Sequence, residues 1–206
     1  MKKIYDISPS VSTRSALFPE DTRLERELLC DYPKSIFQLS RLTCSPHVGA
    51  HADAPLHYDP KGISIDQVEL DPYLGECLVV TCQTRPLILP EDCKKALETK
   101  IPRLLFRTLS QPDPNVFNED FSAFSPEAVE LMGKNGVKLI GIDTPSIDPA
   151  HSKPLPSHQA IRKWGMRNLE NLRLEGVLDA RYELIALPLK LVGFDASPVR
   201  AILREV

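Results

Sequence analysis

The residues most suited to chemistry lie in one short segment, HVGAHADAPLH, at residues 47 to 57. The chain has five histidines in 206 residues. His47, His51 and His57 all lie in this segment, together with Asp53. Imidazole and carboxylate groups bind Zn²⁺ readily, and a carboxylate can bridge two cations through its two oxygens. The segment therefore indicates a metal site; the alternative is a hydrogen-bonded turn rich in polar side chains.

The order of residues within the segment favours an extended backbone, in which side chains alternate between two faces. The odd positions carry the titratable groups His47, His51, Asp53 and His57, and the even positions carry Val48, Ala50, Ala52, Ala54 and Leu56. A helix would instead turn Asp53 about 200° away from His51. A straight strand would span about 33 Å, so we expect Gly49 and Pro55 to bend the chain and His57 to reach in from just beyond the strand.

The remaining sequence predicts short elements of a mixed α/β domain. Nineteen prolines and nine glycines interrupt the chain, which disfavours a helical bundle. Alternating or β-rich segments predict strands at residues 2–8, 35–43, 75–82, 103–108, 137–143 and 182–191, and capping patterns predict helices beginning at Pro90 and Pro126. Ser125 is the expected N-cap of the second helix. Pro188 must break the last strand or place it at a sheet edge.

Composition limits the classes of partner. The length fits a single domain over residues 1–206, and a net charge of −3 with a pI near 6.0 indicates neither a nucleic-acid nor a membrane partner. The first residues, MKKIYDISPS, lack the apolar run of a secretory signal. Five cysteines without a C-x-x-C pair indicate reduced thiols, and thus a cytoplasmic protein.

Two regions of the sequence resemble a known family. SPHVGAHADAPLHYD resembles the H-x-G-[TA]-H-x-D-x-P-x-H signature of the metal-dependent cyclase-like hydrolases. The C-terminal half is similar to one branch of that family, the bacterial kynurenine formamidases or arylformamidases, in the stretches GIDTPSIDP, LPSHQA and YELIALPLKLVGFDASPVRAIL. The resemblance covers essentially the whole chain.

The resemblance implies a fold, an assembly and a set of metal ligands. The fold is a swivelling β/β/α domain with a mixed, largely buried sheet, and the assembly is a homodimer with sites near the subunit interface. Two Zn²⁺ ions per subunit are implied, with Mn²⁺ in some relatives. The implied ligands are His47, His51, Asp53, His158 and Glu170, with Asp53 bridging the two ions. His57 corresponds to the proton donor and acceptor.

The implied pair His158 and Glu170 constrains the local backbone. An uninterrupted helix would separate the two residues by about 18 Å and rotate them about 120° apart. We therefore expect a helix from His158 to Trp164 capped by Ser157, a change of direction at Gly165, and an extended run to Glu170. The other histidine, His151, lies in the proline-rich stretch DPAHSKPLP and is expected at the solvated surface.

The activity implied by the resemblance is hydrolysis of N-formyl-L-kynurenine to L-kynurenine and formate by a metal-activated water. The formamidases carry a tryptophan in a W-P-x-D-T stretch that packs on the substrate ring. Here the aligned stretch is FPEDT, so Phe18 provides the aromatic surface without an indole N–H. The alternatives are a related metal-dependent amidase or lactam hydrolase with another aryl substrate, and a non-catalytic metal-binding protein. A serine hydrolase is disfavoured because the chain lacks a G-x-S-x-G elbow.

Overall fold

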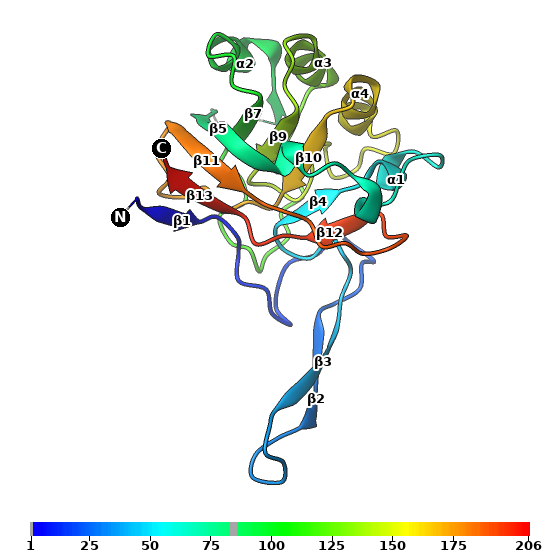
Figure 1. Cartoon of the computed structure of the whole chain (residues 1–206). Coiled ribbons are helices and arrows are strands. Elements are labelled where there is room, and N and C mark those ends of the chain that lie inside the picture. The colour runs from blue at the N-terminus through cyan, green and yellow to red at the C-terminus, as the bar shows by residue number, and fades with distance from the viewer. Residues whose placement is uncertain (1, 83–85) are drawn as a thin grey trace.

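A nine-stranded mixed sheet organises the chain, which we describe over residues 2–82 and 86–206 of a computed structural model (Figure 1). In spatial order its strands are β1 (Ile4–Asp6), β13 (Ile202–Glu205), β11 (Arg181–Ile185), β5 (Leu74–Thr81), β7 (Arg103–Arg107), β9 (Leu139–Ile142), β10 (Arg167–Glu170), β4 (His51–Asp53) and β12 (Ala196–Pro198). The four central strands β5, β7, β9 and β10 are parallel, and the remaining pairs are antiparallel. The expected mixed α/β architecture is confirmed.

Three helices cover one face of the parallel strands (Figure 1). They are α2 (Pro90–Leu97), α3 (Pro126–Lys134) and α4 (Pro156–Trp164). The alternation of β7 divides the core between the two faces of the sheet. Leu104 and Phe106 pack in the apolar cluster under the helices, whereas Leu105 packs in the cluster on the opposite face. Parallel strands buried on both faces explain why this part of the sequence is so continuously apolar.

Most sequence-predicted elements are present with shifted ends. Ser125 caps α3 as expected, its side chain accepting a hydrogen bond from the Ala128 N–H. The strand predicted at 182–191 is broken, as Pro188 requires: β11 (Arg181–Ile185) ends before that proline. Short elements complete the chain: α1 (Pro55–Tyr58), the 3-10 turns η1 (Ile65–Gln67) and η2 (Asp71–Tyr73), and the parallel pair β6 (Leu87–Ile88) and β8 (Ala123–Phe124). Within the described ranges, no helix is both long and apolar enough to cross a membrane.

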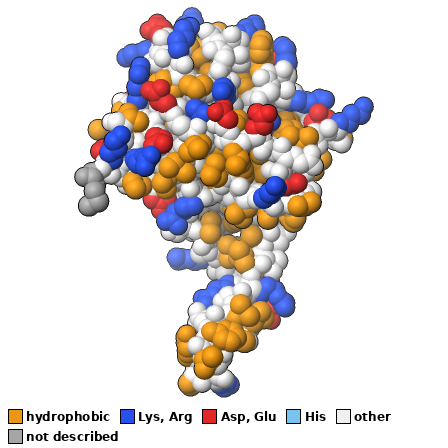
Figure 2. All heavy atoms as spheres, viewed as in Figure 1, with side chains coloured by type: hydrophobic (Ala, Val, Ile, Leu, Met, Phe, Trp, Pro, Cys, Tyr) orange, Lys and Arg blue, Asp and Glu red, His pale blue; other side chains and the backbone are white. Residues whose placement is uncertain are grey.

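A two-stranded arm projects from the body of the molecule (Figure 1). It pairs β2 (Glu25–Cys30) with β3 (Leu39–Thr43) in antiparallel register. The strand expected at 35–43 is therefore shorter than predicted, and it pairs with a strand that the sequence analysis did not identify. The arm presents apolar side chains to solvent (Figure 2), namely Leu28, Leu29, Tyr32, Ile36, Phe37, Leu39 and Leu42.

Candidate metal centre

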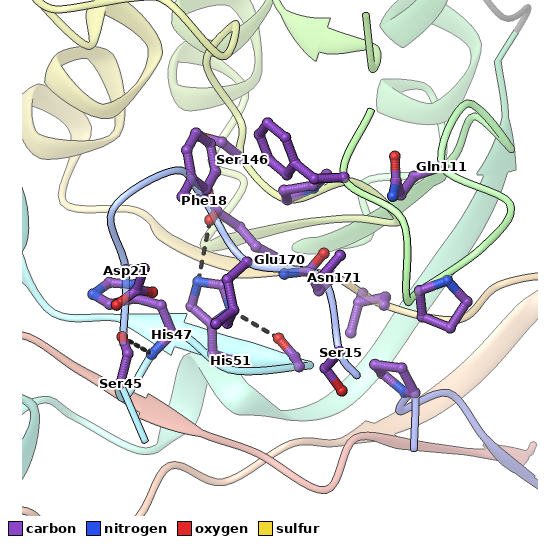
Figure 3. Close-up of a pocket in the computed structure, with 18 of the residues that line it drawn as sticks. Ser15, Phe18, Asp21, Ser45, His47, His51, Gln111, Ser146, Glu170 and Asn171 are labelled. Carbon is purple, nitrogen blue, oxygen red and sulfur yellow. Dashed lines mark hydrogen bonds and ion pairs between the residues drawn. The ribbon is translucent and has the colours of Figure 1, made fainter. Parts of the chain in front are cut away.

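Adjacent strands bring two parts of the candidate site together. β4 and β10 are antiparallel neighbours, and their register places Glu170 directly opposite His51. The two side chains lie on the same side of the sheet, with His51 Nε2 3.2 Å from Glu170 Oε2. His51 Nε2 also lies 3.6 Å from Asp53 Oδ1, because alternation on one strand puts residues two apart on the same face. Figure 3 shows His51 and Glu170 in this arrangement.

The expected extended run over residues 47–57 is confirmed only for the three residues of β4. His47 lies in the turn before the strand, and Gly49 bends the chain there with φ +65°. A Cβ atom at Gly49 would collide with the Val11 side chain. The bend brings His47 Nδ1 to 3.1 Å from Asp53 Oδ1. The even-numbered residues Ala50, Ala52 and Ala54 pack in the core, as the alternation predicts.

After β4 the chain bends at Pro55, and His57 lies just beyond the strand, as expected. Pro55 opens the one-turn helix α1, because the fixed φ of proline suits the first helical position. His57 lies on this helix, and its backbone N–H donates to the Ala54 carbonyl at 2.9 Å. The turn brings the His57 ring back toward the cluster, with ring centroids 4.5 Å from His47 and 5.8 Å from His158.

His158 enters from the first turn of α4. Its Nε2 lies 3.2 Å from Asp53 Oδ2 and 3.5 Å from Glu170 Oε1. The predicted helix cap at Ser157 is wrong: α4 begins at Pro156, two residues earlier than predicted, and the Ser157 hydroxyl donates to the Phe124 carbonyl. The expected end of α4 at Trp164, the turn at Gly165 with φ +64°, and the strand to Glu170 are all present; they are α4, its C-cap and β10.

Asp148 performs the capping that was expected of Ser157. Its carboxylate accepts the backbone N–H groups of Ser157 at 2.8 Å and His158 at 3.0 Å. The same carboxylate contacts His158 Nδ1 at 2.7 Å. Since a carboxylate only accepts, Nδ1 donates to Asp148, and Nε2 is the ring nitrogen that faces Asp53 at 3.2 Å. Asp148 was missed because its role depends on a contact between segments that the sequence does not place together.

The centre of the cluster contains buried polar atoms without hydrogen-bond partners. His51 Nε2 and Asp53 Oδ1 are two such atoms. His51 Nδ1 lies 2.9 Å from the Gly49 carbonyl, so it donates there and leaves the Nε2 lone pair free. Buried acceptors that converge without a donor are costly unless a cation lies between them. The donor set therefore fits divalent metal ions.

The potential ligand atoms form overlapping groups around Asp53. Ligand atoms of His47, His51 and Asp53 lie within 4.8 Å of one another, as do those of Asp53, His57 and His158. Asn168 lies beneath them, donating through Nδ2 to Asp53 Oδ2 at 2.6 Å. Because Asp53 belongs to both groups and each of its oxygens faces a different imidazole, the arrangement can accommodate two cations that share one carboxylate.

The close contacts among these histidines and carboxylates shift their pKa values. Burial lowers the pKa of His47, but hydrogen bonds to Asp195 and Asp53 outweigh it and raise that pKa to about 10. Burial also opposes charge on His158, yet Asp148 and Asp53 raise its pKa well above the usual range. Burial alone would raise the pKa of Asp53, but the contacts with His158 and His47 outweigh it and hold that pKa well below its ordinary value. The carboxylates thus require positive charge nearby, from protons or from a cation.

Asp195 is a second residue that the sequence analysis did not assign to the site. It precedes β12, which pairs with β4 so that Ala196 lies opposite Asp53. The Asp195 Oδ2 atom lies 3.0 Å from His47 Nε2 and 3.3 Å from His57 Nδ1. Hydrogen bonds from these two rings hold the pKa of Asp195 well below its ordinary range. In the sequence, Asp195 belongs to the stretch DASPVR, which indicated resemblance to the family but gave no role for this residue.

Phe18 lies on the wall of the cavity that holds the cluster. The cavity has a volume of about 470 Å³, within the range typical of small-molecule sites. Phe18 packs at 5.0 Å between ring centroids against Phe117 and at 6.3 Å against Phe121. Figure 3 shows Phe18 at the same pocket as His47, His51 and Glu170. The cavity therefore combines an aromatic wall with a polar, acidic floor.

His151 lies away from this cluster, as expected. Its side chain is exposed and pairs with Glu119, with Nε2 3.1 Å from Oε2. Every predicted site residue, from both halves of the chain, therefore lies in the cluster or on the wall of the same cavity, whereas the histidine predicted to be superficial is at the surface.

Comparisons with known proteins agree with this arrangement. The Cyclase family model matches residues 5–149. The kynurenine formamidase of Bordetella pertussis is 51% identical over 211 residues, covering 100% of both chains. A solved structure from Bacillus stearothermophilus, described as a "predicted metal-dependent hydrolase", has a TM-score of 0.84 at 25% identity and covers 100% of both chains.

The fold likeness extends to more distant proteins. An isatin hydrolase solved with the product analogue thioisatinate has a TM-score of 0.86 at 19% identity, covering 98% of this chain and 92% of its own. At that identity the likeness shows the fold alone. The family match over residues 5–149 and the full-length relative at 51% identity show that the chain belongs to the Cyclase family, in agreement with its mixed sheet and its cluster of histidines and carboxylates.

Proposed function

We propose that this chain, acting as a single domain over residues 1–206, is a kynurenine formamidase that hydrolyses N-formyl-L-kynurenine to L-kynurenine and formate. The full-length kynurenine formamidase relative at 51% identity supports the activity. The observation that carries the proposal is the convergence of histidines and carboxylates around Asp53 at the base of a cavity with an aromatic wall.

The proposed ligands are the five residues of the cluster. His47, His51 and Asp53 would hold one Zn²⁺ ion, and Asp53, His158 and Glu170 a second, with Mn²⁺ as an alternative metal. The unpartnered His51 Nε2 and Asp53 Oδ1 atoms support this assignment. When bound, the cations activate water as a nucleophile and stabilise negative charge that develops on the formyl oxygen.

The residues around the proposed ions would position the substrate and move its protons. His57 is partly exposed at the cavity, and in our proposal it transfers a proton to the aryl nitrogen as the C–N bond breaks. The water oxygen becomes a formate oxygen, and the proton that the nitrogen gains originates from that water. Phe18 would pack on the aryl ring, and Phe117 behind it would fix the Phe18 ring in place.

A second candidate is hydrolysis of a cyclic aryl amide such as isatin. The formamidases have a tryptophan where this chain has Phe18, and this difference supports a second candidate substrate. Both substrates present an aryl amide to the same groups, so side-by-side rates on N-formylkynurenine and isatin separate the two. We expect N-formylkynurenine to be hydrolysed with at least tenfold higher kcat/KM.

We propose that the enzyme is a cytoplasmic homodimer assembled through the β2–β3 arm. Ile36, at 90% exposure, and the other apolar side chains of the arm are poor surface residues for a monomer, but they suit burial against a second copy (Figure 2). Five cysteines that form no disulfide support a reducing compartment. Sedimentation equilibrium should give twice the 23.1 kDa chain mass, and Ile36→Asp together with Leu42→Asp should give monomers. A wild-type monomer at micromolar concentration would contradict the dimer.

Formate release tests the function directly. Purified protein should release one formate for each kynurenine from N-formylkynurenine, lose activity after chelation and dialysis, and regain it when Zn²⁺ is added. Undiminished turnover by protein that elemental analysis shows to be metal-free would contradict the proposed chemistry. Absence of turnover by zinc-loaded protein would contradict the proposed substrate.

A further inference from the structure

We infer that Asp195 is a positioning residue that holds the His57 ring in the tautomer and orientation required for proton transfer; the inference rests on the proposed function. Asp195 also contacts His47, so one carboxylate joins the proposed proton-transfer residue to a proposed metal ligand. Neither the sequence pattern nor the relatives' names assigns Asp195 any role.

The hydrogen-bond geometry fixes which nitrogen of each ring is protonated. Asp195 Oδ2 lies 3.3 Å from His57 Nδ1 and 3.0 Å from His47 Nε2. An ionised carboxylate can only accept, so both nitrogens donate to it. His47 Nδ1 is the other ring nitrogen, and it faces Asp53 Oδ1 at 3.1 Å. On His57, Nε2 is left free to accept and return a proton.

His57 borders the region where the reaction is proposed to occur. Ligand atoms of His57, Asp53 and His158 all lie within 4.8 Å of one another. In a neutral imidazole the two nitrogens have opposite roles, so a hydrogen bond at Nδ1 determines the state of Nε2. Asp195 therefore controls the reacting nitrogen without contacting the substrate.

The backbone around Asp195 holds it in a fixed relation to the His57 helix. The Ala54 N–H donates to the Asp195 carbonyl at 2.8 Å, and the Ala54 carbonyl accepts the His57 N–H at 2.9 Å. On either side, Ile65 donates to the Phe194 carbonyl at 2.9 Å, and Ala196 pairs with Asp53 across β12 and β4. One residue, Ala54, thus connects the main chain of the carboxylate to that of the imidazole. Such outer partners commonly alter activity or metal affinity 10–100-fold.

The kinetic test compares Asp195→Ala with a matched control. Glu119→Gln removes the carboxylate from the exposed Glu119–His151 pair, which has the same chemistry at a surface position. We expect kcat of Asp195→Ala on N-formylkynurenine to fall roughly 10–100-fold, with zinc stoichiometry retained at saturating Zn²⁺, while Glu119→Gln matches the wild type. Inactivity of the wild type would reject the proposed function; an active wild type with an equally active Asp195→Ala would reject this inference alone.

Two further measurements separate a positioning role from a general structural one. In a double-mutant cycle, the fall in kcat caused by Asp195→Ala should shrink to less than about threefold when His57 is already alanine. The effects of two residues on kcat are not additive when one residue acts through the other. With ring-substituted formanilides, Asp195→Ala should lose more rate on electron-rich anilides, whose nitrogen departs only when protonated. Equal losses in both backgrounds and across the series would overturn the inference.

A spectroscopic readout does not depend on turnover. The ¹⁵N shifts of the His57 ring, assigned by comparison with His57→Ala and recorded with and without Zn²⁺, should show a hydrogen on Nδ1 in the wild type. Asp195→Ala should shift the neutral ring toward the tautomer with hydrogen on Nε2, and Glu119→Gln should leave it unchanged. The same tautomer in wild type and Asp195→Ala would contradict the role assigned to Asp195.

Discussion

Glu170 lies directly opposite His51 across the β10–β4 pair, with 3.2 Å between Glu170 Oε2 and His51 Nε2. The two residues come from opposite halves of the sequence, and the antiparallel register alone brings them together. The Glu170 carboxylate also accepts the Ile147 N–H at 2.9 Å, which fixes its orientation. The candidate site is therefore built on strands, whose geometry is more rigid than that of loops.

Removing the charge of Glu170 should weaken metal binding. Glu170→Gln preserves the shape of the side chain but replaces an anionic oxygen with an amide, so we expect substoichiometric zinc after dialysis and a loss of kcat of at least about 100-fold. Elemental analysis and formate release measure the two effects. Glu175→Gln, at an exposed carboxylate nearby, is the control and should bind zinc normally. Full zinc content in Glu170→Gln would exclude Glu170 as a ligand.

Removing the His57 ring should separate catalysis from metal binding. His57→Ala should keep wild-type zinc stoichiometry, while kcat falls roughly 10²–10⁴-fold, as expected for loss of a general acid–base group. Parallel zinc analysis and formate assays distinguish the two effects. Loss of one zinc ion per chain in this variant would reassign His57 as a ligand, and unchanged kcat would reject it as the proton-transfer residue.

Gly49 should be intolerant of a side chain for two separable reasons. Gly49→Ala introduces a left-handed alanine, at a cost of about 1–2 kcal/mol, and also a collision with Val11. Gly136→Ala is the matched control, since its φ is +80° but nothing lies within 4 Å of the new Cβ. Urea unfolding should show a larger loss of unfolding free energy for Gly49→Ala than for Gly136→Ala. Gly49→Ala should also bind zinc more weakly, because Gly49 positions His47. Equal losses of unfolding free energy in the two variants would show that the collision with Val11 does not destabilise the fold.

Shortening Phe18 should affect substrate binding more than chemistry. Phe18→Ala removes the aromatic wall, so we expect KM for N-formylkynurenine to rise roughly tenfold, equivalent to about 1.4 kcal/mol, with kcat within about threefold of wild type. Phe18→Trp restores the family's aromatic residue and should keep KM close to the wild-type value. An unchanged KM in the alanine variant would place the aryl ring elsewhere in the cavity.

The pairing of the two ends of the chain should make stability depend on pH. Arg200 donates through Nε to both Asp6 oxygens at 3.0 Å, and this hydrogen bonding lowers the pKa of Asp6 below 3.8 despite partial burial. A depressed carboxyl pKa stabilises the folded state above the unfolded pKa, and that contribution disappears as pH falls through the folded value. Asp6→Asn should therefore lower the urea midpoint at pH 7, and the difference from the wild type should shrink as the pH falls through the folded pKa. A difference that stays constant throughout the acidic range would contradict this linkage.

The local sequence pattern was sufficient to predict those parts of the site that depend on residues adjacent in the chain. Alternation indicated that Ala50, Ala52 and Ala54 face the core, and the glycine conformations at Gly49 and Gly165 were expected from the need to change chain direction. Family resemblance then linked His158 and Glu170 to the histidine segment. The structure places His47, His51 and His158 within 3.6 Å of Asp53, and Glu170 within 3.5 Å of His158.

Contacts between distant segments could not be predicted in the same way. Asp148 replaces Ser157 as the cap of α4, and Asp195 reaches His47 and His57 only because β12 pairs with β4. The β2 strand of the arm was missed because most of its residues are exposed, so burial imposes no alternation on its sequence. These features follow from strand order and register, which a single sequence specifies only weakly.

The central claim is that Asp53 joins two metal ions within one cluster, and anomalous diffraction from zinc-loaded crystals tests it most directly. We predict two zinc peaks per chain, one contacted by His47, His51 and Asp53 and the other by Asp53, His158 and Glu170, with the two Asp53 oxygens divided between them. A single peak, or peaks that Asp53 does not contact, would contradict the binuclear site.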